Sequence, residues 1–515
     1  MPLTTSLFDI GPPEPCPAVF NIAAHVLAPA GRTPEKVALT VLGAGGDALE
    51  RWRFADLDRA IRGTAAGLRA AGLGKGDRVA LRLGNRSAFP ILFFGTIAAG
   101  GIAVPTSAAL TEGEFVQLAE DTAPRFVAME TGLEVPLPEG ATALGPRDWT
   151  ALAAEPAGEI AATGAEDPAF LVYTSGTGGR AKGVLHAQRS AWARRMMWTG
   201  WYGLGAEDRV LHAGAFNWTY TLGAGLTDPW AAGASTLIYT GPAREADWPG
   251  LIGAHGATIF AAVPGVYRQI LRSEGDLRAQ LGALRHALTA GERMPETLAG
   301  DWEARTGRPV YEALGMSEIS TYVSASPSGA RRPGAAGRPQ AGRRVAVLDP
   351  TGRPCPVGEA GELAVSTRDP GLMLGYWRRP EETASQITGE WFLTGDGARM
   401  DAHGYVTHLG RTDEVMTALG YRVSPQEVED ALAPHPGIAE IAVAELPVRA
   451  DLALIAAFVV PTAVWPGEDV LTAYADARLA RYKQPRIWIP VERLPRTANG
   501  KLLRRALIET HRRDR

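Results

Sequence analysis

The feature that most constrains the fold is a regular alternation of short apolar runs with alanine- and arginine-rich stretches, which continues to about residue 410. Apolar runs such as RVALRL, GIAVP, STLIY and ATIFAAV are bounded by glycine and other turn residues, and their length is typical of buried strands. The stretches between them, such as LDRAIRGTAAGLRAAGL, are helical in character. Strands that alternate with helices build mostly parallel sheets covered by helices. The sequence therefore predicts an α/β fold.

The length and the later part of the chain predict more than one domain. A chain of 515 residues exceeds the size that one hydrophobic core usually serves. After about residue 335 the sequence becomes rich in proline and glycine, which favours a β-rich subdomain over about 335–412. Ser424, Pro425 and Glu427 then stand at the N-cap, N1 and N3 positions of a capping box. We expect a large domain over residues 1–412 and a compact α+β domain over 413–515.

Composition excludes several classes of protein. The net charge of -4 and the absence of a basic stripe argue against nucleic acid as a partner. Cys16 and Cys355 are too few for a disulfide framework and form no C-x-x-C pair, which argues against a structural zinc site. The first residues have no signal-peptide character, and no apolar run reaches about 18 residues. We expect a cytoplasmic protein that acts on small molecules and does not insert into a membrane.

The stretch YTSGTGGRAKGV, from Tyr173 to Val184, has the composition of a phosphate-binding loop. Its glycines allow backbone amides to approach an anion, its hydroxyl groups add donors, and Lys182 adds positive charge. It is not a Walker A loop, because Ala181 precedes the lysine and Gly183 follows it. A flexible surface turn is the alternative interpretation of this loop taken alone.

Five further stretches follow in order along the chain. They are TAGERMP (289–295), YEALGMSE (311–318), WFLTGD (391–396), GRTDE (410–414) and PRTANGK (495–501). The first two follow apolar runs and end at polar turns, where α/β sheets place their ligand crevices. Each stretch alone also fits an ordinary turn, a helix start or a solvated loop, so their order and spacing carry the argument.

In that order and spacing, the six motifs resemble those of the acyl-adenylate-forming superfamily. This superfamily includes acyl-CoA synthetases, benzoate-type CoA ligases, luciferase and the adenylation domains of peptide synthetases. The resemblance extends over nearly the full chain and implies stacked sheets in the large domain and a mobile C-terminal domain. It also implies an acid–thiol ligase that uses ATP, Mg²⁺ and coenzyme A: a carboxylate attacks the α-phosphate of ATP, and the acyl-AMP then passes to the thiol. A homodimer is compatible with this class.

The resemblance assigns roles to residues that match the motifs. For the β- and γ-phosphates it implies Thr174, Ser175, Gly176, Thr177 and Lys182. For Mg²⁺ it implies Glu318 with Thr174, and for the α-phosphate the hydroxyl of Ser317. For the ribose it implies Asp396 with Arg411 nearby, and for the adenine Gly291, Glu292, Ala313 and Leu314.

The C-terminal motifs are implied to serve two half-reactions. Lys501 would neutralise the carboxylate and the α-phosphate during adenylation. Asp413 matches the hinge about which the small domain would rotate. After rotation, the loop with Gly420, Tyr421 and Arg422 would help to admit coenzyme A.

The chain departs from the family pattern at a few positions. Gly178 and Ala181 replace a hydroxyl residue and a proline in the phosphate loop, which removes one donor and loosens the loop. Leu314 stands where an aromatic residue is usual, and Met416 where a polar residue is common. None of these changes removes a charge that the chemistry needs.

The segment FNWTYTLG matches the family's acid pocket and supplies Asn217, Trp218, Tyr220 and Gly223 as candidates, although plain core packing is the alternative. Bulky Trp218 and Tyr220 would shorten the pocket, and the segment holds no lysine or arginine for a second carboxylate. We expect a short- or medium-chain or aromatic monocarboxylate. Two other functions stay open: a ligase that loads a carrier protein, although no carrier domain is evident after Lys501, and a non-catalytic nucleotide-binding protein.

Overall fold

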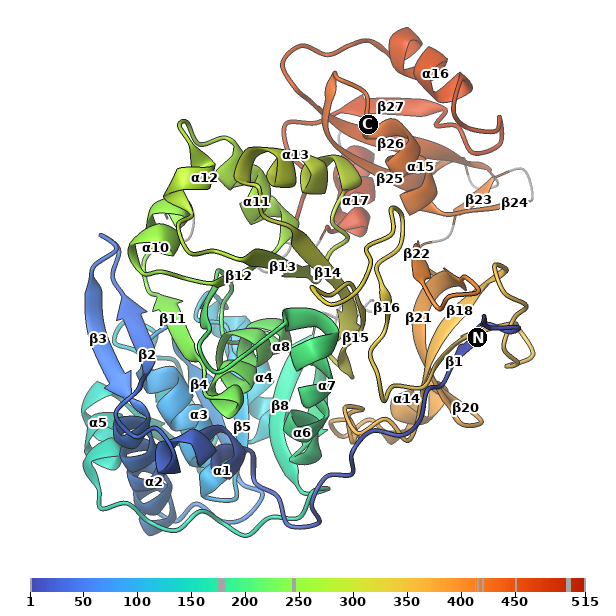
Figure 1. Ribbon diagram of the computed structural model, residues 1–515. Coiled ribbons are helices and arrows are strands. Elements are labelled where there is room, and N and C mark those ends of the chain that lie inside the picture. The colour runs from blue at the N-terminus through green and yellow to red at the C-terminus, as the bar shows by residue number, and fades with distance from the viewer. Residues whose placement is uncertain are drawn as a thin grey trace.

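A computed structural model describes residues 2–174, 181–242, 247–412, 414, 416–418, 421–449, 452–496 and 502–513. Of residues 417–418, 421–422, 448–449, 452 and 512–513 it describes the backbone alone. The described chain forms two helix-covered sheets, then an antiparallel sheet, then a smaller C-terminal part (Figure 1). The predicted α/β class is confirmed.

The larger sheet has the strand order β16-β15-β14-β13-β12-β10-β11-β2-β3. The bounds of its strands are β2 Val37–Leu42, β3 Ala48–Arg53, β10 Arg209–His212, β11 Ser235–Tyr239, β12 Ile259–Ala262, β13 His286–Ala290, β14 Val310–Met316, β15 Ser320–Ser324 and β16 Arg338–Pro339. Its strands from β2 to β14 run parallel, whereas β3, β15 and β16 pair antiparallel at the two edges.

The second sheet has the order β19-β9-β8-β5-β4-β6-β7. Its strands are β4 Arg78–Arg82, β5 Ile102–Thr106, β6 Phe126–Met129, β7 Thr142–Leu144, β8 Pro168–Thr174, β9 Lys182–Ala187 and β19 Gly375–Tyr376. Helix α3 (Ala88–Ala98) is apolar on all sides and buried along nearly its whole length, which is typical of a helix enclosed between layers. It shares one core with strands of both sheets, and this core joins them into one body.

Further helices cover these sheets. Their bounds are α1 Ile22–Leu27, α2 Phe54–Ala70, α4 Glu112–Thr122, α5 Pro146–Ala154, α6 Arg189–Ala193, α7 Arg195–Met197, α8 Thr219–Leu222, α9 Asp228–Ala232, α10 Trp248–Ala254, α11 Pro264–Leu271, α12 Leu277–Gln280 and α13 Glu296–Thr306. A 3-10 turn, η1, spans Ala28–Gly31, and two π-helical turns, η2 and η3, span Trp198–Tyr202 and Gly223–Thr227.

The segment predicted to be β-rich folds as an antiparallel sheet, with helix α14 (Pro380–Ser385) beside it. Its strands are β1 Leu7–Phe8, β17 Val345–Leu348, β18 Ala360–Ser366, β20 Ile387–Thr388, β21 Trp391–Met400 and β22 Val406–Arg411. Strand β1 comes from the N-terminus and pairs with β17, so the blue end of the chain lies beside the orange sheet in Figure 1. The sequence did not predict this pairing.

The C-terminal part combines short sheets with helices, as predicted. Its elements are β23 Met416–Ala418, β24 Tyr421–Val423, α15 Pro425–Leu432, β25 Ile438–Arg449, β26 Leu452–Pro461, α16 Glu468–Asp476, β27 Ile487–Pro490 and α17 Arg504–Arg513. The Ser424 hydroxyl caps α15 by accepting from the Glu427 backbone, with Pro425 at the first helical position. The reciprocal half of the predicted capping box is replaced, because the Glu427 carboxylate pairs with Lys483.

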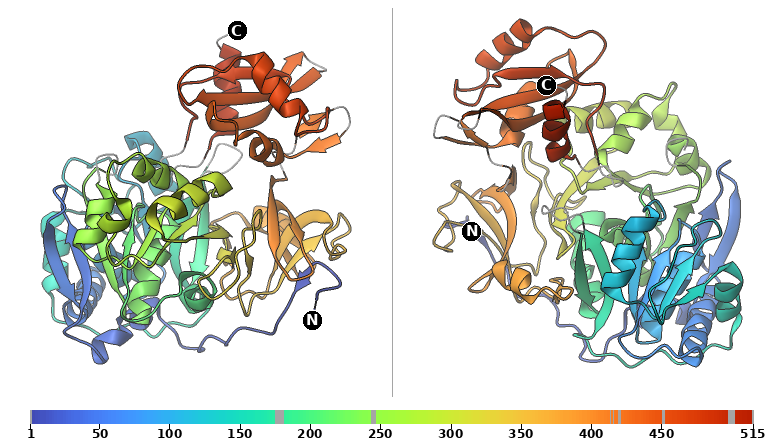
Figure 2. Two further views of the ribbon diagram at one scale, coloured as in Figure 1. Left: turned by 45° about the horizontal axis from the view of Figure 1, so that its top comes forward. Right: turned by 180° about the vertical axis from the view of Figure 1, so that it is seen from behind.

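The C-terminal part lies near α11, α13 and β22, far from α2 and α5 (Figure 2). The boundary predicted at residue 413 falls between β22 and β23, and Asp413 itself lies outside the described residues. In the part of the chain that the structure describes, no helix has the length and apolar character that crossing a membrane requires.

Candidate active site

A cavity of about 1360 Å³ lies where the C-terminal part meets the large domain. Residues of β8, β14, β21 and β22 line it, together with residues of α15 and of the segment before α17. Its volume is above the usual range for small-molecule pockets, which suits a site that receives more than one substrate.

The phosphate loop lies between β8 and β9 in the sequence, and its described flanking residues, Thr174 and Lys182, lie at the wall of this cavity. Thr174 ends β8 and lies opposite Lys182, which begins β9. The Lys182 ammonium is 2.6 Å from the Glu382 carboxylate and 5.0 Å from the ring centre of Tyr376. Thr174 and Lys182 both line the cavity, whereas Ser175, Gly176, Thr177 and the departure at Gly178 lie outside the described residues.

Glu318, the predicted metal ligand, follows β14 and accepts a 2.8 Å hydrogen bond from the Tyr376 hydroxyl. Burial and the adjacent Glu318 carboxylate hold the pKa of Tyr376 above its ordinary range, so the phenol stays protonated and donates. Ser317 lines the same cavity. Tyr376 therefore positions the carboxylate and also lies beside Lys182, a role that the sequence motifs did not indicate.

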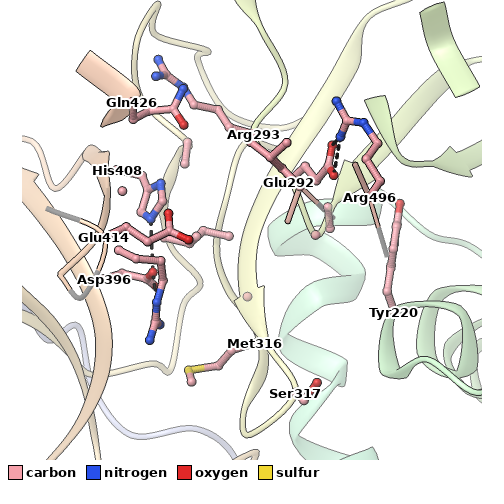
Figure 3. Close-up of a pocket in the computed structure, with 18 of the residues that line it drawn as sticks. Tyr220, Glu292, Arg293, Met316, Ser317, Asp396, His408, Glu414, Gln426 and Arg496 are labelled. Carbon is pink, nitrogen blue, oxygen red and sulfur yellow. Dashed lines mark hydrogen bonds and ion pairs between the residues drawn. The ribbon is translucent and has the colours of Figure 1, made fainter. Parts of the chain in front are cut away.

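Asp396, the predicted ribose ligand, is 7% exposed and lies on β21 opposite Arg411 of β22. Its Oδ1 is 3.5 Å from Arg411 Nη1 and 3.3 Å from His408 Nε2 (Figure 3). The antiparallel pairing of two neighbouring strands thus brings the two predicted residues together, and His408 is added to them. A carboxylate held beside two nitrogen groups suits the recognition of paired hydroxyl groups.

The predicted adenine wall is spread over two strand ends. Gly291 and Glu292 follow β13, and Ala313 and Leu314 belong to β14. All four line the cavity. Glu292, however, also forms an ion pair with Arg496, with oxygen–nitrogen distances of 2.8 and 3.0 Å (Figure 3).

Glu312 is a further carboxyl group of the cavity, and the sequence motifs assigned it no role. It lines the cavity beside Ala313 and accepts a 3.1 Å hydrogen bond from the Met294 backbone. Burial raises its pKa to about 7, so it takes up a proton near neutral pH. The YEALGMSE motif predicted roles only for neighbours of Glu312, because the sequence alone does not show how deeply each side chain is buried.

The predicted acid pocket divides between two cavities. Asn217, Trp218 and Tyr220 line the large cavity, and the rings of Trp218 and Tyr220 meet edge to face at 5.3 Å. A Cβ on Gly291 would lie 2.5 Å from the Trp218 ring, so this glycine makes room for the indole. Gly223 lies instead at a smaller, adjoining cavity. Trp218 and Tyr220 thus give this part of the cavity an aromatic wall.

The remaining C-terminal candidates are described in part. Gly420 and Lys501 lie outside the described residues, and Tyr421 and Arg422 belong to β24 by their backbones. Arg496 and Leu502, which flank the segment that carries Lys501, both line the cavity.

Within the described residues, no group of three or more His, Cys, Asp or Glu side chains could hold a metal ion. Mg²⁺ that arrives with ATP needs only one or two protein carboxylates, since phosphate and water oxygens complete its shell. Glu318 can supply that carboxylate, so the donor set fits a metal delivered with the nucleotide.

A fold of this kind, with strand ends, cations and carboxylates around one interdomain cavity, defines a nucleotide-using enzyme. The sequence pattern described as "AMP-binding enzyme" matches residues 27–377, and the one described as "AMP-binding enzyme C-terminal domain" matches residues 427–501. The chain therefore belongs to the AMP-binding enzyme family. Within it the chain groups with the AMP-forming acyl- and aroyl-CoA ligases, which are acid–thiol ligases.

Particular relatives include both benzoate-type CoA ligases and acyl-coenzyme A synthetases. A 3-hydroxybenzoate–CoA ligase of Aromatoleum sp. (strain CIB) is 29% identical over 486 residues, which cover 88% of this chain and 91% of that protein. The human mitochondrial acyl-coenzyme A synthetase ACSM4 is 28% identical, over 98% of this chain and 92% of its own length. The crystal structure of the anthranilate CoA ligase AuaEII with anthranoyl-AMP superposes with a TM-score of 0.87 at 28% identity, covering 96% of this chain and 98% of that one.

Proposed function

We propose that this ligase activates an aromatic or a short- to medium-chain monocarboxylate through an acyl-AMP and transfers the acyl group to coenzyme A. The observation that carries this proposal is the continuity of one cavity from the Lys182 and Asp396 side chains to the apolar wall of Trp218 and Tyr220. The size of these two aromatic side chains favours a short acid over a long one. Relatives that act on hydroxybenzoate and on acyl substrates support the same two classes of acid.

The chemistry requires one anion to attack another. Lys182 and the predicted Lys501 would offset the charge of the triphosphate and of the acid, and Ser317 would donate to the α-phosphate. Asp396 would hold the ribose and orient the nucleotide for in-line attack. Glu318 would hold Mg²⁺, which supplies charge neutralisation on the phosphate oxygens when it is bound.

The second half-reaction needs a different arrangement of the C-terminal part. We propose that the chain turns near Asp413, which would move the Lys501 segment away and bring the loop at Gly420, Tyr421 and Arg422 to the thiol. The boundary between residues 412 and 413, the cytoplasmic location and a homodimer stay predictions.

A panel of acids tests the activity. Benzoates, branched acids and straight-chain acids of increasing length are offered with ATP and Mg²⁺, with and without coenzyme A, while pyrophosphate and thioester are measured. We expect pyrophosphate with short or aromatic acids and thioester only when coenzyme A is present. Acyl-AMP that never becomes acyl-CoA would favour the loading of a carrier protein, and the absence of pyrophosphate with every acid would contradict the proposal.

A further inference from the structure

A second cavity, of about 30 Å³, adjoins the large one, and its mostly apolar wall includes a few polar side chains. Thr219 and Ser320 line both cavities, so the small one continues from the acid side of the site. A space of this size holds one or two groups as large as a water molecule. It can therefore receive the end of a substrate and no more.

The main polar group at this cavity is the guanidinium of Arg194, which is 8% exposed. It forms hydrogen bonds of 2.6 to 3.0 Å with the carboxylate of Asp228, which is buried, and one of 2.9 Å with the Tyr202 hydroxyl. Another of its nitrogens, Nη1, donates to the hydroxyl of Ser320. These contacts use four of its five N–H groups, which leaves the second hydrogen on Nη1 without an acceptor among the described residues.

The backbone is shaped to place this guanidinium. Tyr202 ends one π-helical turn and Gly223 begins another, and π-helical turns are frequent at functional sites. A Cβ on Gly223 would lie 1.7 Å from Arg194 Nη2, so only glycine leaves room for the side chain there. Gly223, which was predicted to line the acid pocket, is therefore needed to make room for the side chain of Arg194.

Two further buried polar side chains, Ser190 and His186, lie at the same cavity. Ser190 and Arg194 are four residues apart, which places them on one face of the chain as it leaves α6. The Ser190 hydroxyl is buried and has no hydrogen-bond partner among the described residues. His186 is 3% exposed, stacks on Phe170 at 4.6 Å and has the Ser317 backbone as a polar neighbour.

Unpartnered polar groups around a small buried space are costly unless something polar fills it. The electrostatics limit what that group can be. Asp228 cancels the charge of Arg194, so the cavity has no net positive charge with which to hold a second carboxylate. Its volume also fits a single hydroxyl or carbonyl oxygen better than a carboxylate.

The geometry points to a specificity site: we propose that the preferred acid carries a neutral hydroxyl or carbonyl group at the end remote from its carboxylate, received by Arg194, Ser190 and Ser320. This inference rests on the proposed function and deepens it, because it selects within the aromatic and short-chain monocarboxylates. The FNWTYTLG segment holds no arginine, and the arginine at this cavity is Arg194, the residue after α6, whose charge Asp228 neutralises.

The test compares acids of one skeleton that differ in a single group. Pairs of meta- and para-substituted benzoates and pairs of straight-chain acids are used, each pair with a hydroxyl or a methyl group at the remote position. A third member carries a carboxylate there. We expect kcat/KM for adenylation to be roughly tenfold or more higher for the hydroxyl member of at least one skeleton, because a hydrogen-bonding site discriminates against an analogue that leaves it unpaired. A preference for the methyl or the dicarboxylate member would overturn the proposal.

Variants assign the preference to this cavity. Ser190→Ala removes one hydroxyl and leaves the Arg194–Asp228 pair in place, and Arg194→Lys keeps the charge but loses the planar fork. Both variants should lower the ratio of kcat/KM for the hydroxyl acid to kcat/KM for the methyl acid at least about fivefold, while the methyl acid still reacts. The matched control is Ser324→Ala, since the hydroxyl of Ser324 is buried on β15, donates to the Gly200 backbone and lies at neither cavity.

If Ser190→Ala leaves this ratio of kcat/KM values unchanged, the proposal is also overturned. This outcome decides the question even if Arg194→Lys fails to fold. Calorimetric binding of the same acids to the protein provides a readout that does not need turnover. If no acid releases pyrophosphate, the proposed function fails. The calorimetric comparison of the hydroxyl and methyl acids then still shows whether the cavity prefers a hydroxyl group.

Discussion

At the scale of single residues, the predicted cation Lys501 is the side chain on which adenylation should depend most. Lys501→Ala should lower the rate of acyl-AMP formation by at least about a hundredfold, because a cation at the developing charge is worth several kcal/mol in a preorganised site. Conversion of separately supplied acyl-AMP to thioester should stay near the wild-type rate. The matched control is Lys483→Ala, whose ammonium pairs with Glu427 in the same part of the chain, and which should leave both half-reactions within about twofold.

Single-turnover measurements of each half-reaction check this prediction. An equal loss in both half-reactions would show that Lys501 supports the fold or a shared binding step and not the first step alone.

A second residue, Glu312, should make stability depend on pH. Burial raises its pKa in the folded protein from 4.5 to about 7, so between these values the folded state holds a proton that the unfolded state has released. The contribution of this group to the free energy of unfolding is therefore largest at acid pH and falls as the pH rises towards 7, by up to about 3 kcal/mol. Glu312→Gln should remove that part of the slope.

Urea unfolding of the wild type and Glu312→Gln from pH 5 to 8 provides the measurement. Glu207→Gln is the control, because the Glu207 side chain is 98% exposed. Parallel pH profiles for the wild type and Glu312→Gln would contradict the prediction.

At the scale of secondary-structure elements, the turn after β13 supports the acid site through Gly291. This glycine has a φ of +89°, and a Cβ there would lie 2.5 Å from the Trp218 ring, a bulky group that cannot yield easily. Gly291→Ala should destabilise the protein by about 1 to 3 kcal/mol and raise KM for the acid more than KM for ATP. Gly265→Ala, in the first turn of α11 where a Cβ meets nothing within 4 Å, should change neither. A Gly291→Ala protein with unchanged KM for the acid would refute the link to Trp218.

Elements were the level at which the sequence predicted most. Strand-length apolar runs gave β4, β5 and β12 in the expected α/β context, and Ser424 with Pro425 marked the start of α15. Thr174, Glu318 and Asp396, which the motifs singled out, also line one cavity, although they lie on or next to strands of three different sheets.

The remaining features depend on contacts that no local pattern encodes. Arg194 and Asp228 meet across 34 residues, and Arg496 and Glu292 across 204. Strand β1 pairs with β17 through partners at Leu7 and Ala346. The protonation of Glu312 likewise follows from its burial in the folded chain. Such features need three-dimensional neighbours, which propensity and periodicity do not supply.

At the scale of the whole molecule, ion pairs connect the two parts of the chain across the cavity. Arg293, after β13, donates to Asp430 of α15, and Arg496 bridges Glu292 of the large domain and Glu440 of β25. These contacts hold the segment that flanks Lys501 beside the predicted nucleotide residues. They should therefore favour the arrangement for adenylation over the arrangement for thiol transfer.

Asp430→Asn tests this reasoning because it removes one of these ion pairs. Asp430 is 42% exposed, and an exposed ion pair contributes at most about 1 kcal/mol, so adenylation should slow by roughly two- to fivefold. Thioester formation from acyl-AMP should be unchanged or faster, because its arrangement does not use the pair. The difference between the wild type and the variant should shrink as salt is raised from about 0.05 to 0.5 M, since screening weakens the pair in the wild type.

The matched control for Asp430→Asn is Glu303→Gln, which breaks an ion pair with Arg331 inside the large domain and should alter neither half-reaction. Separate rates for the two half-reactions at both salt concentrations decide the outcome. If Asp430→Asn slows adenylation and thiol transfer to the same extent, or if salt leaves its effect unchanged, the ion pairs do not choose between the two arrangements. A selective, salt-sensitive loss of adenylation would instead show that these ion pairs stabilise the arrangement for adenylation relative to the arrangement for thiol transfer.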